Sequence, residues 1–279
     1  PFWMSLPSQN SYTTKSMLRS STMNNILAIA QKELRSYFAS PIGYVVIGMF
    51  ALLFGYFYYG TLSFFVQQSM QVSQFDFGGP AALNINQHVI RPMLNNSIVF
   101  TLFVLPMITM RTYSEEKRSG TMELLLTSPL SDIQIVMGKF FGAMGLYVMM
   151  LAVTLLDIGL LFIYGNPEWP QVLVGYLGLL LLGGCFISVG LLISSTTKNQ
   201  IVSGIVTFTV FLILWVITWL GDNASPLTQT ILSYLSITEH FEDFSRGVLD
   251  TKHVVYYLSF TVFGLFLTLK SVDRERWKE

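Results

Sequence analysis

The side chains in this sequence that could do chemistry are few and lie far apart. Asp157 stands alone in an apolar run, TLLDIGLL, and a carboxylate inside lipid is a functional candidate because its insertion is costly. The three histidines, His88, His240 and His253, are widely spaced, which favours surface residues over metal ligands. His240 precedes a Glu-Asp pair by two residues, so a metal site there stays open as an alternative.

Motifs that bind nucleotides or catalytic metals are missing from the sequence. There is no G-x-x-x-x-G-K-[ST] phosphate loop, since Gly138-Lys139 is followed by Phe140, and there is no H-E-x-x-H zinc motif. The single cysteine, Cys185, provides neither a disulfide framework nor a thiol-rich metal site. The 16 basic and 16 acidic residues balance, which gives no reason to expect nucleic-acid binding. We therefore expect neither an enzyme nor a bound cofactor.

Long apolar stretches of the sequence are expected to form the helices that position these residues. The sequence is 52% hydrophobic and 11% charged, with a mean hydropathy of +0.54, more apolar than one soluble core can hide. This predicts an all-α polytopic membrane protein. Six spans are expected, at about residues 43–66, 92–110, 140–164, 172–193, 201–220 and 254–269.

The first 22 residues differ from the rest of the chain. They contain nine Ser or Thr and no acidic residue, and Lys15 and Arg19 are their only charged side chains. This composition predicts a disordered leader, with a transit peptide as the alternative, before a permease-like domain over 23–279. Met23 is a candidate natural start.

Charge distribution predicts the orientation of the spans. Thirteen of the 16 Lys and Arg residues fall before the first span, between the second and third, between the fourth and fifth, or after the sixth. Cytoplasmic loops carry such an excess, so both termini and the stretch from Arg111 to Lys139 are expected to be cytoplasmic. Residues 67–91 are expected to form an outer loop.

Two amphipathic helices are expected outside the spans. In NNILAIAQKELRSYF, residues 24–38, one stripe is apolar, which predicts an interfacial helix or an ordinary leader helix; the stripe is Ile26, Ala30, Leu34 and Phe38. Ser236 and Glu239 have capping-box spacing, which predicts a short outer helix between the last two spans. Ser40-Pro41 is expected to start the first span.

The stretch RTYSEEKRSGTMELLLTSPLSD, residues 111–132, concentrates charge beside a leucine run. Residues 121–127 can make about two helical turns, and Ser128-Pro129 resembles the start of the next helix. A helix this short is marginal alone, so lipid or a partner protein must cover its leucines. The glycine spacing Gly138-x-x-x-Gly142 permits close helix packing just after it.

Three segments resemble one family. MRTYSEEKRSGTMELLLTSPLSDIQIVMGKFFG is similar to the segment of ABC-2 type transporter permeases that carries an acidic-basic run, Gly-Thr, Glu-Leu-Leu, Ser-Pro and Gly-Lys. NNILAIAQKELRSYFASPIGYV resembles the amphipathic entry helix of that family. EHFEDFSRGVLDTKHVVYYLSF resembles its last outer helix, particularly in the gliding-motility branch, and the likeness covers nearly everything after Met23.

The resemblance implies a permease subunit of an ATP-driven exporter in the bacterial inner membrane. It implies a second permease subunit, in a homo- or heterodimer, and two copies of a separate ATPase that binds ATP and Mg²⁺. The family implies a hydrophobic or lipid-linked substrate. It also implies that the segment between spans two and three is a coupling helix that contacts the ATPase; its residues are Glu115, Glu116, Arg118, Gly120, Thr121, Glu123, Leu124, Leu125 and Leu126.

Alternatives stay open from the residues themselves. The short helix could rest on the inner leaflet instead of docking a partner. Asp157 is expected to face the interior, where it lines a transport path, pairs across a dimer, or makes a structural hydrogen bond. An ion-coupled secondary transporter would use Asp157 as its ion site. A membrane assembly scaffold is a further alternative.

Overall fold

The computed structural model describes residues 10–75, 84–221 and 225–276, and every regular element in these ranges is a helix. The all-α prediction is confirmed. In chain order the elements are α1 (Asn10–Ala39), α2 (Ile42–Phe75), the π-helix η1 (Asn86–Ile90), α3 (Arg91–Thr109), α4 (Ser114–Ser119), α5 (Thr121–Leu126), α6 (Asp132–Tyr164), α7 (Trp169–Thr196), α8 (Gln200–Gly221), α9 (Pro226–Leu235), α10 (Ile237–Ser245) and α11 (Thr251–Arg276).

Six helices among the described residues are long and apolar enough to cross a membrane, and they match the six expected spans. Several continue past the expected ends. α2 has 34 residues, about 51 Å at 1.5 Å per residue, and α6 begins at Asp132 rather than near 140. An apolar window measures hydrocarbon thickness, whereas backbone hydrogen bonding continues a helix into polar surroundings.

Two predicted irregular regions are largely helical. α1 passes through Met23 without a break, so residues 10–22, expected to be disordered, belong to a helix; residues 1–9 lie outside the described part of the chain. Of the expected outer loop, residues 67–75 continue α2 and η1 leads directly into α3. The Gly-Gly-Pro at 78–80 lies outside the described residues.

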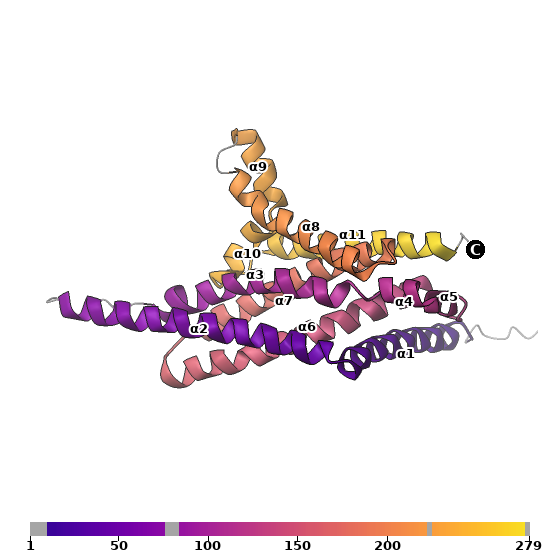
Figure 1. The fold of residues 1–279 in the computed structure, drawn as a ribbon, viewed down its shortest axis with the longest axis horizontal. Coiled ribbons are helices and arrows are strands. Elements are labelled where there is room, and N and C mark those ends of the chain that lie inside the picture. The colour runs from indigo at the N-terminus through magenta and orange to yellow at the C-terminus, as the bar shows by residue number, and fades with distance from the viewer. Residues whose placement is uncertain (1–9, 76–83, 222–224, 277–279) are drawn as a thin grey trace, which may run out of the picture.

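The long helices lie alongside one another, and α1, α4 and α5 gather at one end, near the end of α11 (Figure 1). We call this the α5 end. α10 lies toward the opposite end, the α10 end, and α9 stands out from the bundle (Figure 1). α9 is not expected from the sequence, while α10 is, and the Ser236 side chain accepts the predicted capping bond from the Glu239 backbone amide at 3.2 Å.

α7 is the central helix, packed against α3, α6, α8, α10 and α11. Its contact with α6 requires a glycine, because a Cβ added at Gly183 would lie 2.1 Å from a ring carbon of Tyr147. The Tyr147 hydroxyl crosses this contact and donates to the Leu179 carbonyl at 3.1 Å. Tyr147 is fully buried, so the hydrogen bond satisfies a group that lipid and core would leave unpaired. The hydrogen bond thereby helps to hold α6 and α7 in register.

Candidate functional site

A bent pair of short helices, α4 and α5, connects α3 to α6. Gly120 ends α4 in the left-handed region, with φ at +73°, and starts α5. A side chain there would be strained by about 1–2 kcal/mol, although the space around it is open. Glycine therefore sets the bend, and the pair forms a compact protrusion that we call the α4–α5 segment (residues 114–126).

The three leucines of α5 have different surroundings. Leu126 is buried, together with Met122 on the same face, and Leu125 is half-buried against the core. Leu124 is 73% exposed. All three leucines were predicted to contact a partner. Positions 122 and 126, however, share a helical face that the chain itself covers. Leu124 is the leucine that the described chain leaves open.

The start of α6 corrects the sequence prediction. Ser131, not Ser128, is the N-cap, and it forms a capping box with Gln134 in which the Gln134 side chain accepts from the Ser131 amide at 3.1 Å. Ser128 instead donates its hydroxyl to the Leu125 carbonyl at 2.6 Å, so it terminates α5. Asp132 lies in the first turn, as expected. The two helix ends are joined by only a few residues, which limits their independent movement.

A buried lysine fastens the α4–α5 segment to the bundle. The Lys139 side chain on α6 is 1% exposed, and its Nζ lies 2.9 Å from a Glu116 carboxylate oxygen and 3.0 Å from Glu33 on α1. Nζ also donates to the Thr112 carbonyl at 2.9 Å. A buried ammonium is tolerable only when it is paired and hydrogen-bonded, and all of these conditions are met. Lys32 adds a surface ion pair to Glu116 at 3.5 Å, which balances the charges.

The predicted glycine spacing brings α1 into this cluster. A Cβ at Gly138 or Gly142 would lie 2.6 Å from Ile29 or Glu33, respectively, so α1 packs backbone-close on α6. This confirms the close packing expected from the spacing. The face of α1 that packs on the bundle is centred on Ile29 and Tyr37. Each lies one residue before a member of the predicted apolar stripe, so the buried face is rotated by about 100° from the predicted one. Glu33 belongs to that face because Lys139 compensates its charge.

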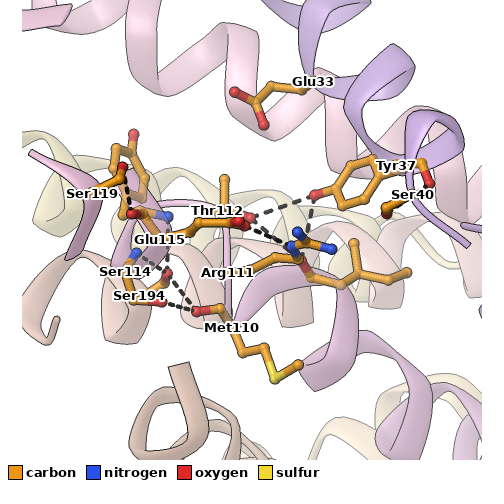
Figure 2. Close-up of polar contacts among 12 residues, drawn as sticks. Glu33, Tyr37, Ser40, Met110, Arg111, Thr112, Ser114, Glu115, Ser119 and Ser194 are labelled. Carbon is orange, nitrogen blue, oxygen red and sulfur yellow. Dashed lines mark hydrogen bonds and ion pairs between the residues drawn. The ribbon is translucent and has the colours of Figure 1, made fainter. Parts of the chain in front are cut away.

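Tyr37 connects α1 to the end of α3. Its hydroxyl donates to the Ile108 carbonyl at 3.4 Å and lies 3.5 Å from the Thr112 hydroxyl, as Figure 2 shows. Burial raises the pKa of Tyr37 above its ordinary value, and the hydrogen bond with Thr112 opposes this only in part. The phenol therefore stays protonated and remains a donor at any cellular pH.

A serine at the end of α7 holds the start of α4. The Ser194 hydroxyl accepts from the backbone amides of Tyr113 and Ser114, at 3.0 and 3.2 Å, and donates to the Met110 carbonyl at 3.1 Å (Figure 2). Ser194 is fully buried, so one hydroxyl satisfies three backbone groups between α3 and α4.

The C-terminal end of α11 and the end of α7 also hold α4, through Lys117. Lys117 pairs with Glu275 at 3.1 Å and donates to the Ser195 carbonyl at 2.5 Å.

The remaining predicted residues lie at the surface of the segment. Glu115 pairs with Arg111 at 2.8 Å along one helical turn. Arg118, Thr121 and Glu123 are exposed, whereas Glu116 is internal. The structure therefore separates the predicted set into residues that attach the segment, Glu116 and Leu126, and residues that face outward around Leu124.

Lys139, Glu33 and Ser194 were not predicted as site residues. The sequence does place Lys139 and Glu33 beside apolar helix positions, which is a sign of a buried ion pair. Their contact could not be predicted, because it depends on the packing of α1 against α6.

Asp157 lies on α6, half-buried, within electrostatic reach of Tyr58 on α2 and Tyr176 on α7. It makes no hydrogen bond or ion pair with a residue in the described part of the chain. A structural hydrogen bond within the chain is therefore not observed there. A role in a path, or in pairing across a dimer, stays a prediction.

The histidines correct another expectation. His240 and His253 are 8% and 6% exposed, and their Nδ1 atoms lie 2.7 Å apart, so neither is a surface residue. The two stand 13 positions apart, and the turn between α10 and α11 folds them together. Only His88, half-buried in η1, keeps a partly open ring.

Comparison with known proteins identifies the family. The model described as "ABC-2 family transporter protein" matches residues 27–270, most of the chain. Relatives named "Probable multidrug ABC transporter permease YbhR", from Escherichia coli K12 and from Escherichia coli O157:H7, are each 26% identical over 184 residues, which cover 59% of this chain and 48% of the relative. The chain thus matches about half the length of these curated relatives. With its six apolar helices and its short helical pair between the second and third, this chain belongs to the ABC-2 family of transporter permeases.

Proposed function

We propose that this chain is the permease subunit of an ATP-driven exporter and that its α4–α5 segment receives the movement of a separate ATPase subunit. The observation that carries this proposal is the contrast within α5. Leu124 is 73% exposed at the surface, while Met122 and Leu126 are buried by the chain itself. An exposed apolar side chain beside the exposed charges of Arg118 and Glu123 offers one anchor of the kind that groove-docking helices use.

Movement of the segment would reach several helices together. Glu116 is paired with Lys139 on α6, and the amides of Tyr113 and Ser114 are held by Ser194 on α7. Lys117 is paired with Glu275 on α11. These contacts join the segment to α6, α7 and α11 together, so a displacement of Leu124 would be passed to all three helices.

The assembly that fits this function has two permease subunits, alike or different, and two ATPase subunits that bind ATP and Mg²⁺. The charge distribution of the sequence supports a cytoplasmic location for the α5 end and both termini, in a bacterial inner membrane. The chain itself would hold no nucleotide, because it has no phosphate loop.

The proposed substrate is a hydrophobic or lipid-linked molecule. The name of the Escherichia coli relatives refers to multidrug transport, which is compatible with apolar cargo. Membership of the gliding-motility branch stays a prediction based on the last outer helix and the start of α11.

Two other functions are tested by the same residues. An ion-coupled transporter would depend on Asp157, which is half-buried and near two tyrosines. It would transport without any ATPase. A membrane assembly scaffold would bind partners through the α4–α5 segment but would not transport.

The decisive substitution is Leu124→Glu. A charge placed in an apolar groove should weaken association with the ATPase at least tenfold, which is about 1.4 kcal/mol or more, while membrane insertion is retained. Copurification with a co-expressed candidate ATPase subunit, at matched expression, measures the effect. Leu227→Glu on α9 is the matched control, because Leu227 is also 73% exposed but lies on a different short helix.

The outcomes separate the alternatives. Loss of both copurification and transport in Leu124→Glu, with Leu227→Glu unchanged, supports the exporter. Loss of copurification without any transport defect removes ATP coupling and favours the ion-coupled function. Unchanged copurification and transport would mean that α5 rests on lipid.

A further inference from the structure

A second cluster of chemically competent side chains lies at the α10 end, away from the α4–α5 segment. His253 on α11, Asp243 on α10 and Asp250 in the turn between them place one ligand atom each within 4.8 Å of one another. His253 is 6% exposed, and its Nε2 lies 2.8 Å from Asp243 Oδ2. One buried imidazole and two carboxylates are a donor set for a divalent ion with nitrogen and oxygen preference.

The hydrogen-bond chain behind His253 decides which of its nitrogens is available. The Tyr234 carbonyl can only accept, so the His240 Nε2, at 3.0 Å, must carry a proton and donate. In the neutral ring that carries its proton on Nε2, Nδ1 of His240 is a lone pair. That lone pair accepts from Nδ1–H of His253 at 2.7 Å.

With its Nδ1 proton committed to His240, His253 has Nε2 left to face the carboxylate of Asp243. A nitrogen lone pair and a carboxylate oxygen 2.8 Å apart repel unless a cation lies between them. A proton satisfies Nε2 and Asp243 but does not link them to Asp250, which pairs instead with the exposed Lys252. A divalent metal ion engages all three groups.

We propose that His253 Nε2, Asp243 and Asp250 form a binding site for a divalent transition-metal ion of the Zn²⁺ type. His240 orients the ligating ring, as the partner of the second nitrogen does in protein zinc sites. Ligand atoms about 2.1 Å from a tetrahedral ion stand about 3.4 Å apart, so Asp243 moves outward by only about half an ångström. Water completes the coordination, since three protein ligands leave one position open.

The surroundings of the proposed site include an open cavity and a lysine that would compete with a metal ion for Asp250. A surface cavity of about 310 Å³ is lined by His240, Lys252 and His253, so the His253 ring borders an open space. Lys252 Nζ lies 3.0 Å from Asp250 Oδ2, but this pair is exposed and therefore weak. Asp250 Oδ1 accepts from the Lys252 amide at 2.9 Å and can keep doing so when a metal replaces the ammonium at Oδ2.

A bound ion would tie α10 to α11 across the turn between them. Gly247, with φ at +83°, gives this turn its shape. The ligands come from both helices and from the turn, so the metal adds a cross-link where the chain reverses direction. The site does not depend on the proposed exporter function, and its test needs no ATPase.

The experiment is a Zn²⁺ titration of the purified full chain in detergent at pH 7.5, with a chromophoric zinc chelator as competitor. One Zn²⁺ per chain is expected. Asp243→Asn should weaken binding at least tenfold, and Lys252→Gln should strengthen it, because the competing ammonium is removed. His88→Gln is the matched control, since His88 is another histidine expected on the same side of the membrane but is outside the cluster.

Co²⁺ provides an independent readout, because a tetrahedral site with nitrogen and oxygen ligands gives visible absorption bands. Thermal unfolding without metal confirms that Asp243→Asn, which changes a partly exposed side chain, still folds. Absence of stoichiometric Zn²⁺ binding to the unmodified chain would overturn the proposal. Equal binding in Asp243→Asn would do the same, as would a cluster that takes up only a proton on acidification.

Discussion

The two ends of this molecule bury charge in different ways. At the α5 end, Lys139 is paired with Glu33, 106 positions away, and with Glu116. At the α10 end, two imidazoles 13 positions apart share one hydrogen bond beside Asp243. Lysine and glutamate ordinarily titrate far from neutrality, whereas imidazole titrates close to it. The α5 end is therefore built to keep one arrangement, while the α10 end carries imidazoles, whose ordinary pKa lies near neutrality.

The difference suits the positions of the two clusters. The role proposed for the α4–α5 segment requires that it stay attached to the bundle. Ion pairs to α6 and α11 and hydrogen bonds to α7 provide that attachment. The histidine pair at the α10 end joins neighbouring elements of the chain, α10 and α11, although α10 also packs on α7. Three substitutions test this contrast.

The largest effect is expected for Lys139→Met, which removes the cation and leaves two carboxylates facing each other. Breaking a buried ion pair by removing one partner typically costs 3–5 kcal/mol, so the variant should unfold at a clearly lower denaturant concentration or temperature. Unfolding in detergent measures this. Lys32→Met is the matched control, because Lys32 is 64% exposed although it contacts the same Glu116.

Adding Glu33→Gln and Glu116→Gln to Lys139→Met should recover part of the lost stability, since the stranded charges are then removed. If Lys139→Met were as stable as Lys32→Met, the cluster would not be an attachment point and the contrast between the two ends would fail.

A smaller effect is expected for Ser194→Ala. The substitution leaves the buried amides of Tyr113 and Ser114 without their acceptor, which should cost about 1–3 kcal/mol. Ser119→Ala removes an exposed hydroxyl from the same segment and should change stability by less than about 0.5 kcal/mol. Comparable unfolding curves for the two alanine variants would show that Ser194 does not hold α4.

The smallest effect is a pH dependence at the α10 end. Burial lowers the pKa of His240, so its contribution to stability is complete above the ordinary imidazole value of about 6.5 and is lost as the pH falls through the lower folded value. Charging His240 would set its N–H against that of His253. Asp243 and Lys252 also face this ring, and they act in opposite directions.

The measurement is the melting temperature in metal-free buffer at pH 7.5 and at pH 5. The unmodified chain should lose stability on acidification, and His240→Gln should lose less. A pH dependence that is unchanged in His240→Gln would assign it to other groups.

Much of the fold was accessible from the sequence because lipid imposes a strong constraint. Six apolar stretches predicted six long helices. The arginines at 91 and 111 placed α3 within about one residue of its observed bounds, although the apolar helical run continues beyond it at both ends. Hydrophobic length does not specify where a helix ends in polar surroundings, so α2 and α6 extend past their predicted limits. The start of α6 was misplaced because Ser128 and Ser131 both fit a cap, and only the local geometry distinguishes them.

The candidate sites show the same division. The sequence alone determined that charge and leucines concentrate between the second and third spans, that Gly138 and Gly142 permit close packing, and that the family is that of the ABC-2 permeases. These are local properties, carried by spacing within one helix or motif. Only the tertiary structure decided that Leu124 is open while Leu126 is covered, that Lys139 meets Glu33, and that His240 meets His253. Each of these depends on which face one helix presents to another, and that choice is made by the packing of the whole bundle.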